Sequence, residues 1–172
     1  MSATKPPAIY CYSKSGTTRH VAKALAQSTG AEVVPIDATR YNFPLLWMFR
    51  AIWDVGRANV LPLDFGSGIL AKRPWIVVAA PIWADQLAPP GRTVLRELAA
   101  SDIPVGVLTT SGRASEQPKC FSTCEAVLGR ALAAQLNVQS RTVDTPDMTC
   151  KLAQFAEGLG QRHVSAVSDV VG

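Results

Sequence analysis

Short apolar runs alternate with longer segments of helical periodicity along this sequence, and this alternation restricts the fold more than any other feature. Runs that are apolar at consecutive positions are typical of strands buried on both faces of a parallel sheet. The predicted strands are 8–12, 31–36, 75–80, 103–109 and, with a more polar composition, 137–143. The predicted helices are 17–27, 89–100, 120–135 and 146 to about 158.

Residues at helix ends support this division. Gly30 follows the first predicted helix and is expected to end it. Thr145, Pro146 and Asp147 supply a capping hydroxyl, a proline in the first turn and an acidic first turn for the last helix. Right-handed crossovers between such units predict an α/β three-layer sandwich with a five-stranded parallel sheet. The 172 residues suit one domain, 1–172.

Composition narrows the class of protein. Apolar residues make up 48% of the chain and charged residues 17%, which is a globular rather than a disordered composition. The net charge is +4, but the basic residues are scattered, so nucleic-acid binding is not expected. No apolar run reaches the roughly 18 residues of a transmembrane segment. Lys5 and two prolines directly precede the first strand, with no signal-peptide pattern, so we expect a cytoplasmic protein.

The four cysteines do not form a metal-binding pattern. There is no C-x-x-C pair, and only two histidines, His20 and His163, are present. Cys120 and Cys124 are four positions apart, so both can lie on one face of a helix. We interpret them as ordinary helix residues, with a functional dithiol as the less favoured alternative.

Loops after the first, third and fourth strands are where a doubly wound sheet places its ligand site. The first of them, 13–18, carries the hydroxyls of Ser13, Ser15, Thr17 and Thr18 around Gly16, directly before a helix. A helix N-terminus with hydroxyls and a glycine favours a phosphate dianion. A simple capping turn is the alternative, although one cap accounts for one hydroxyl only. Neither a G-x-x-x-x-G-K-[ST] nor a G-x-G-x-x-G motif is present.

The other two loops suit a flat heterocyclic ligand. Trp83, in the predicted loop 80–90, could stack on an aromatic ligand or pack on the next helix. The hydroxyls and backbone N–H groups of 109–115 could bind the edge of a heterocycle, or form an ordinary polar loop.

The motifs S-x-S-G-T-T at 13–18, P-I-W at 81–83 and T-S-G at 110–112, in this order, resemble the flavodoxin-like family. The resemblance covers about 9–155 and implies strand order 2-1-3-4-5 with noncovalently bound FMN. It implies that the FMN phosphate is held by Ser13, Ser15, Gly16, Thr17 and Thr18. One side of the isoalloxazine would be lined by Pro81, Ile82, Trp83 and Ala84. The other edge would be lined by Ser111, Gly112 and Arg113.

One segment is not explained by this scheme. In the apolar insertion at about 41–63, residues 43–53 are almost entirely apolar, beyond what an amphipathic helix requires. It could cover the flavin and shape a substrate pocket, form a homodimer interface through 43–56, or be buried core. Docking on a membrane surface is the least favoured reading.

We therefore expect an FMN-binding flavodoxin-like protein that transfers electrons to a redox partner protein or reduces a small acceptor such as a quinone. No acid–base pair or nucleophilic triad is evident, and neither His20 nor His163 is expected to be catalytic. Asp85 and Arg113 are the charged groups nearest the expected ring, and a cation there would make the flavin less reducing. The alternative is a flavodoxin-fold module without flavin that acts through protein contacts at 45–53.

Overall fold

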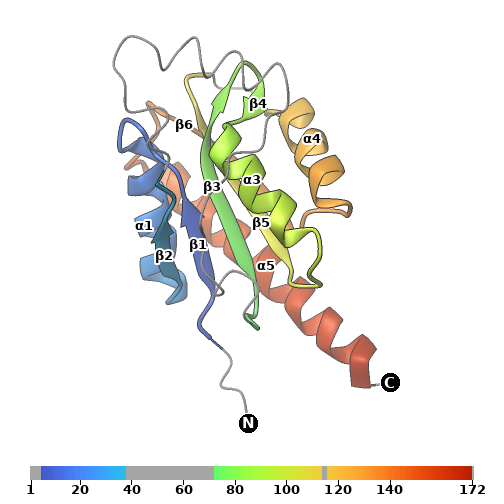
Figure 1. Ribbon diagram of the computed structural model, residues 1–172. Coiled ribbons are helices and arrows are strands. Elements are labelled where there is room, and N and C mark those ends of the chain that lie inside the picture. The colour runs from blue at the N-terminus through green and yellow to red at the C-terminus, as the bar shows by residue number, and fades with distance from the viewer. Residues whose placement is uncertain (1–4, 38–71, 114–115, 172) are drawn as a thin grey trace.

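The computed structural model describes residues 5–37, 72–113 and 116–171 of the 172-residue chain (Figure 1). Its elements, in chain order, are β1 (Ala8–Cys11), α1 (Thr17–Thr29), β2 (Glu32–Pro35), β3 (Ile76–Trp83), β4 (Gln86–Leu87), α3 (Pro89–Leu98), β5 (Val105–Ser111), α4 (Pro118–Leu128), β6 (Ala134–Gln139) and α5 (Pro146–Val171). The apolar insertion at 41–63, and with it the homodimer prediction for 43–56, lies outside the described residues.

Five parallel strands lie in the order β2-β1-β3-β5-β6. This is the predicted 2-1-3-4-5 order once the short β4 is set aside. β4 pairs antiparallel with the end of β3, which makes a hairpin at one edge of the sheet. The central register pairs Cys11 with Ala79 and Ala79 with Leu108, so the three central strands end close together.

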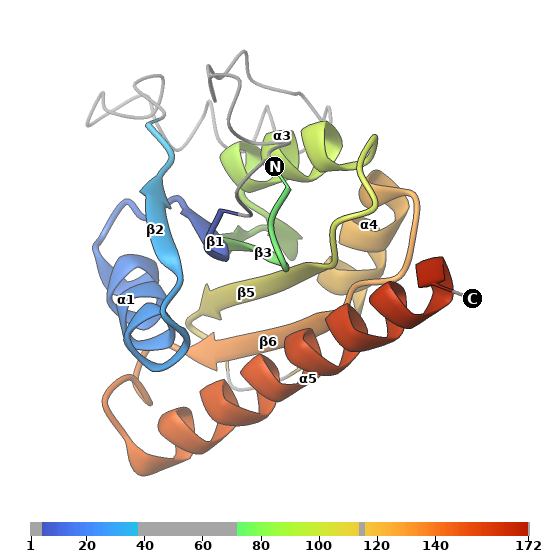
Figure 2. The same cartoon turned by 90° about the horizontal axis from the view of Figure 1, so that it is seen from below.

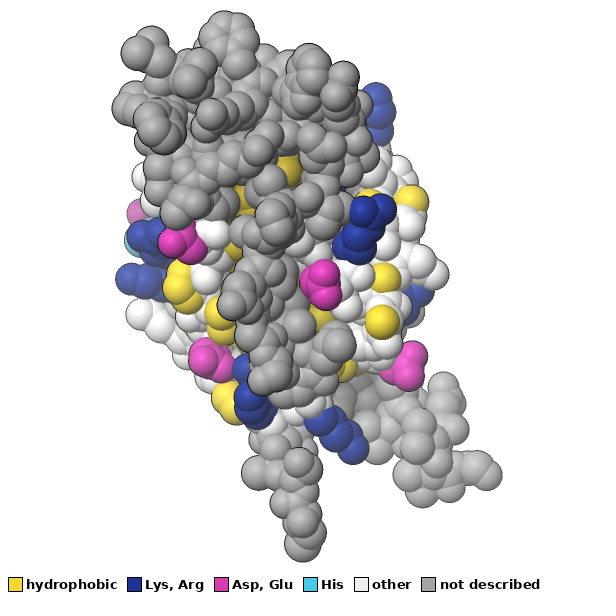
Figure 3. Space-filling view, in the orientation of Figure 1, with side chains coloured by type: hydrophobic (Ala, Val, Ile, Leu, Met, Phe, Trp, Pro, Cys, Tyr) yellow, Lys and Arg dark blue, Asp and Glu magenta, His cyan; other side chains and the backbone are white. Residues whose placement is uncertain are grey.

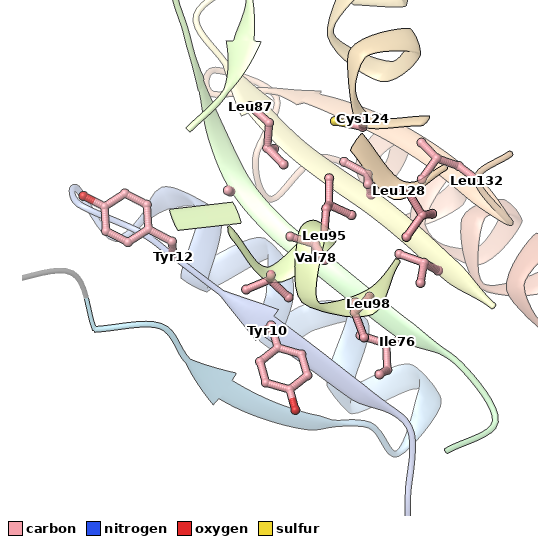
Figure 4. Packing of buried hydrophobic residues seen from close by; sticks show 14 of the residues in the cluster. Tyr10, Tyr12, Ile76, Val78, Leu87, Leu95, Leu98, Cys124, Leu128 and Leu132 are labelled. Atoms are coloured by element: carbon pink, nitrogen blue, oxygen red, sulfur yellow. The ribbon is translucent and has the colours of Figure 1, made fainter. Parts of the chain in front are cut away.

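Helices cover both faces of the sheet, as predicted (Figure 2). Strand residues alternate between the two cores because side chains of a strand point to opposite faces in turn. One core joins the sheet to α1 and α5, with Val21, Leu25 and Phe155 among its buried members. The other joins it to α3 and α4 through Leu95 and Leu128, among others (Figure 4). The molecule is thus a three-layer α/β sandwich.

Helix ends explain where the predicted boundaries hold and where they are wrong. Gly30 adopts a left-handed conformation and ends α1, as expected. The helix predicted over 120–135 instead ends at Leu128, because Gly129 is left-handed (φ 77°) and donates its N–H to Glu125 O. The strand predicted over 137–143 is β6, which begins at Ala134 and ends at Gln139.

The last helix begins where predicted and ends later. The Thr145 hydroxyl accepts the N–H of Met148 at 3.3 Å, and Asp147 lies in the first turn. The predicted end near Gly158 is wrong, since α5 continues to Val171. Gly158 does not adopt the left-handed conformation that ends α1 and α4, so α5 continues through it.

The surface agrees with the scattered charge seen in the sequence. In the view of Figure 3, described lysine and arginine side chains lie at separate places rather than in one patch. Among the described helices, none is both long enough and apolar enough to cross a membrane.

Candidate functional site

The candidate site lies at the carboxyl edge of the sheet, where β1, β3 and β5 end. Tyr12 continues the pairing of β1 with β3 by donating its N–H to Ala79 O at 2.9 Å. Beyond this bond the chain leaves the sheet and forms the loop 13–18 before α1. The hairpin after β3 and the loop after β5 leave from the same edge (Figure 1).

The first loop turns through Gly16. This residue is left-handed (φ 93°), caps α1, and donates its N–H to Ser13 Oγ at 3.1 Å. The first backbone donor within the helix is His20, whose N–H reaches Gly16 O at 2.9 Å. The N–H groups of the preceding first turn therefore have no acceptor within α1. The hydroxyls of Ser15 and Thr17 lie 3.3 Å apart at the exposed side of this turn.

Thr18 differs from the other hydroxyl residues of the loop. Its side chain is buried, and its Oγ1 lies 2.7 Å from Thr110 Oγ1 on β5. The hydroxyl thus ties α1 to the sheet. Thr18 can serve a ligand at this loop through its backbone N–H, and its predicted role there stays a prediction.

The segment predicted as a loop after the third strand is a strand and a tight hairpin. Pro81, Ile82 and Trp83 are the last residues of β3, so the prediction that they lie in a loop is wrong. The chain turns at Ala84 and Asp85, which both have positive φ (47° and 61°), and returns as β4. Two left-handed central residues match the right-handed twist of the paired strands.

Trp83 packs against Tyr12, the residue that directly precedes the first loop. Its ring centroid lies 5.7 Å from that of Tyr12, with the two planes at 85°. Tyr12 is buried, and this burial raises the pKa of its hydroxyl to about 12. The pair joins the end of β1 to the end of β3.

The third loop leaves β5 at Ser111 and is held by hydrogen bonds. Ser111 Oγ donates to Arg113 O at 3.0 Å and accepts from the Asn137 side-chain amide at 3.1 Å. Thr109 Oγ1 in turn donates to Asn137 Oδ1 at 3.0 Å. The side chains of the two neighbouring threonines therefore hydrogen-bond different elements: Thr109 bonds to Asn137 of β6, and Thr110 bonds to Thr18 of α1.

A cavity of about 320 Å³ lies between the hairpin and the third loop. Its lining consists of Ile82, Ala84, Asp85, Ser111, Gly112, Arg113 and Gln117. Arg113 Nη1 donates to Asp85 Oδ1 at 2.8 Å, so an ion pair joins the two walls at their exposed side. The volume is at the lower end of small-molecule sites, about 300 Å³ upward.

Five residues that the family resemblance predicted for the ring site meet in this cavity: Ile82, Ala84, Ser111, Gly112 and Arg113. The other predicted residues, Ser13, Ser15, Gly16, Thr17, Thr18, Pro81 and Trp83, lie at the same edge of the sheet and outside its lining.

Neither a protein-family model nor a curated protein sequence matches the chain. Solved structures do match its fold. A candidate flavoprotein from Bacteroides eggerthii DSM 20697 is similar with a TM-score of 0.66 and 16% identity, over 90% of this chain and 99% of that chain. A flavoprotein from Lactobacillus acidophilus NCFM in complex with FMN gives a TM-score of 0.55 and 21% identity, over 83% of this chain and 97% of that chain. A flavodoxin from Megasphaera elsdenii is similar with a TM-score of 0.53 and 13% identity, over 90% of this chain and 98% of that chain.

The chain has a flavodoxin-like fold. Its order β2-β1-β3-β5-β6 reverses direction between β1 and β3, and ligands of open α/β sheets bind at such a switch point. The loop 13–18 and the hairpin at Ala84 and Asp85 flank this point of the flavodoxin-like sheet. The cavity lies one strand further along, between β3 and β5.

Sequence reasoning missed three residues of this site. Gln117, which is buried and lines the cavity, precedes α4 and carries no motif. Thr110 hydrogen-bonds Thr18 at the end of the first loop, and Asn137 hydrogen-bonds Ser111 at the start of the third loop. One sequence signal pointed to such contacts. Thr109 and Thr110 end an apolar strand, and buried hydroxyls require hydrogen-bond partners. Within the described part of the chain, no group of three His, Cys, Asp or Glu residues could hold a metal.

Proposed function

We propose that the protein binds FMN at this edge and transfers electrons between the flavin and a second molecule. The observation that supports the proposal most is that two features lie at the same carboxyl edge of the sheet. A hydroxyl loop lies at a helix N-terminus that has no side-chain cap, and a cavity lined by five of the predicted site residues lies one strand further along. The flavin-containing neighbour from Lactobacillus has the same fold.

The residues present fit the two ends of FMN. Ser13, Ser15 and Thr17, together with the backbone around Gly16 and Thr18, offer hydrogen-bond donors for a phosphate, and no carboxylate belongs to this loop. A Cβ at Gly16 would meet no atom within 4 Å, so the backbone there is open to a ligand. The ring would contact Pro81, Ile82, Trp83 and Ala84 on one side. Ser111, Gly112 and Arg113 would line its other edge.

FMN, when bound, supplies one- and two-electron chemistry, and the chain's own residues bind and orient it. Arg113 does not present a bare positive charge to the ring, because Asp85 pairs with it at 2.8 Å. The proposed raising of the flavin potential by Arg113 is therefore weaker than the sequence alone suggests. We propose a redox partner protein or a small acceptor such as a quinone as the second molecule, in the cytoplasm.

Titration of the purified protein with FMN tests the proposal. We expect a flavin absorbance spectrum and binding at micromolar FMN or below. Riboflavin, which lacks the phosphate, should bind more weakly. The variant S15A/T17A should weaken FMN binding and leave riboflavin binding unchanged, whereas S122A, an exposed serine on α4, should change neither. A protein that fails to bind FMN at micromolar concentrations would overturn the proposal and favour a flavin-free module.

A further inference from the structure

A second cavity, of about 280 Å³, lies at the edge of the sheet formed by β6. Among the described strands, β6 pairs with β5 on one side and with none on the other. Figure 2 shows β6 at this edge, with α4 on one side of it and α5 on the other. The cavity shares no lining residue with the cavity between the hairpin and the third loop, so the proposed flavin site does not use it.

One part of the lining is apolar. Phe121 of α4 is buried and belongs to the core between α4, α3 and the sheet. Leu136 of β6 packs against the opposite core, and Pro118 is the first residue of α4. Because both faces of the sheet contribute residues, the cavity extends around the edge strand. An apolar group of a ligand would leave water here, and this favours binding.

The side-chain amides of β6 form a polar part of the lining. Asn137 is held in place, since its amide donates to Ser111 Oγ at 3.1 Å and its Oδ1 accepts from Thr109 Oγ1 at 3.0 Å. Gln135 lies two positions earlier on the same face of the strand. Its side chain is exposed and forms no hydrogen bond within the described part of the chain. The Gln135 amide can therefore donate to a ligand and accept from it.

Two opposite charges belong to the same lining. Lys151 lies in the second turn of α5, and its Nζ donates to Asp147 Oδ2 at 2.7 Å. This ion pair holds the ammonium group and leaves further donors on it for a ligand. Glu116 is exposed, precedes α4 and forms no ion pair with a described residue. A ligand with one charge would be attracted by one of these groups and repelled by the other, whereas a zwitterion can pair with both.

We propose that this cavity binds a small zwitterion with an apolar side chain, of the class of the apolar α-amino acids. The ammonium group of the ligand binds Glu116, and its carboxylate binds Lys151 and Gln135. Its apolar side chain packs on Phe121 and Pro118. The volume of about 280 Å³ equals that of about nine molecules of liquid water. This space suits a ligand of roughly nine non-hydrogen atoms, which is the size of leucine.

NMR titration of the isotope-labelled full-length protein with L-leucine, in the absence of flavin, tests the proposal. We expect a dissociation constant on the order of 1 mM or below. The amide signals of Gln135, Leu136 and Asn137 should shift as leucine is added. Two analogues separate the charges: L-leucinamide lacks the carboxylate, and isocaproic acid lacks the amine. Each should bind roughly three- to tenfold more weakly than leucine, because each loses one charged partner.

Two variants remove the charges of the cavity one at a time. K151A should weaken leucine binding roughly three- to tenfold and leave leucinamide binding unchanged. E116Q should weaken leucine binding by a similar factor without weakening isocaproic acid. Matched controls are K23A on α1 and E157Q on α5, which are exposed positions outside the lining and should change neither affinity. Circular dichroism shows whether each variant is folded.

The proposal is overturned if leucine at about ten times the expected dissociation constant leaves the β6 signals unchanged. Equal binding of leucine and isocaproic acid, or equal effects of K151A and K23A, would also overturn it. Shifts confined to the loops at Gly16 and Gly112 would place leucine at the flavin site instead. FMN titration of K151A and E116Q keeps the two proposals apart, because both variants should bind FMN as the original protein does.

Discussion

The hydroxyl oxygens of Thr18 and Thr110 lie 2.7 Å apart inside the protein, although 92 positions separate the two residues in the chain. Thr18 is in the first turn of α1, and Thr110 is one residue before the end of β5. The bond joins the loop expected to hold a phosphate to the strand that carries one wall of the cavity. The spacing between the two halves of the candidate site therefore depends on this contact.

Removing one of these hydroxyls should destabilise the fold. In T18V the Thr110 hydroxyl loses its partner in a buried site, so we expect the free energy of unfolding to fall by about 1–3 kcal/mol. T18V/T110V should recover part of the loss, because neither buried hydroxyl then remains unpaired. Urea unfolding measures both. T123V is the control, since Thr123 is a half-buried threonine of α4 whose hydroxyl makes an exposed bond to Lys119 O, and it should change stability by less than about 0.5 kcal/mol.

Two glycines should respond to alanine in opposite ways. A Cβ at Gly91 would meet Ala80 Cβ at 2.9 Å and Leu87 Cδ2 at 3.0 Å, so G91A must push α3 away from β3 and β4. We expect a loss of about 1–3 kcal/mol. G158A lies within α5 with its nearest neighbour at 3.5 Å and should gain up to about 1 kcal/mol from helix propensity. Thermal unfolding compares the pair, and equal effects would contradict the close contact of α3 with the hairpin.

Alkaline pH should unfold the protein through buried acids at the end of β1. Burial raises the pKa of Cys11 from 9.0 to about 11 and that of Tyr12 from 10.0 to about 12. Their protonated forms are favoured in the folded state, so the stabilisation is complete below pH 9 and is lost as pH rises towards 12. Each group should contribute on the order of 2 kcal/mol to that loss. Unfolding in urea at several pH values checks this, and Y12F should show a smaller decrease.

The ion pair across the cavity should matter more for a bound flavin than for stability. Asp85 and Arg113 are both exposed, so D85N and R113Q should each cost roughly 0–1 kcal/mol in urea unfolding. In the FMN-loaded protein, D85N leaves the guanidinium uncompensated and should raise the midpoint potential, whereas R113Q should lower it. Potentiometric titration separates the two. Shifts of the same sign in both variants would show that Arg113 does not act on the ring through its charge.

Much of the fold could be predicted because strand burial leaves a direct mark on sequence. Apolar runs predicted four of the five parallel strands, a more polar segment predicted the fifth, and the resemblance to the flavodoxin-like family implied their order. The end of α4 could not be placed, since Ala131, Leu132 and Ala133 extend the apolar pattern beyond the left-handed Gly129. The hairpin was missed for a related reason. Ala84 and Asp85 adopt positive φ without a glycine, so no turn signal marks them.

The loops of the candidate site could be predicted from the sequence, but the contacts that join them could not. Local motifs and the family resemblance identified the hydroxyl loop and five of the seven residues that line the cavity, because helix N-termini and strand ends have local sequence signals. The Thr18–Thr110 bond and the Asp85–Arg113 ion pair join residues that are distant in sequence. Contacts of this kind are set by sheet order and register, which no local pattern contains.

The hairpin of β3 and β4 has a consequence for any ligand of the cavity. Ile82 pairs with Leu87, and Trp83 with Gln86, so the backbone of this wall is already hydrogen-bonded before a ligand arrives. A free loop in its place would lose conformational entropy on binding, and that loss would weaken the affinity. The wall is preorganised. Ligand affinity here should therefore depend on the contacts themselves, with little cost for ordering the chain that makes them.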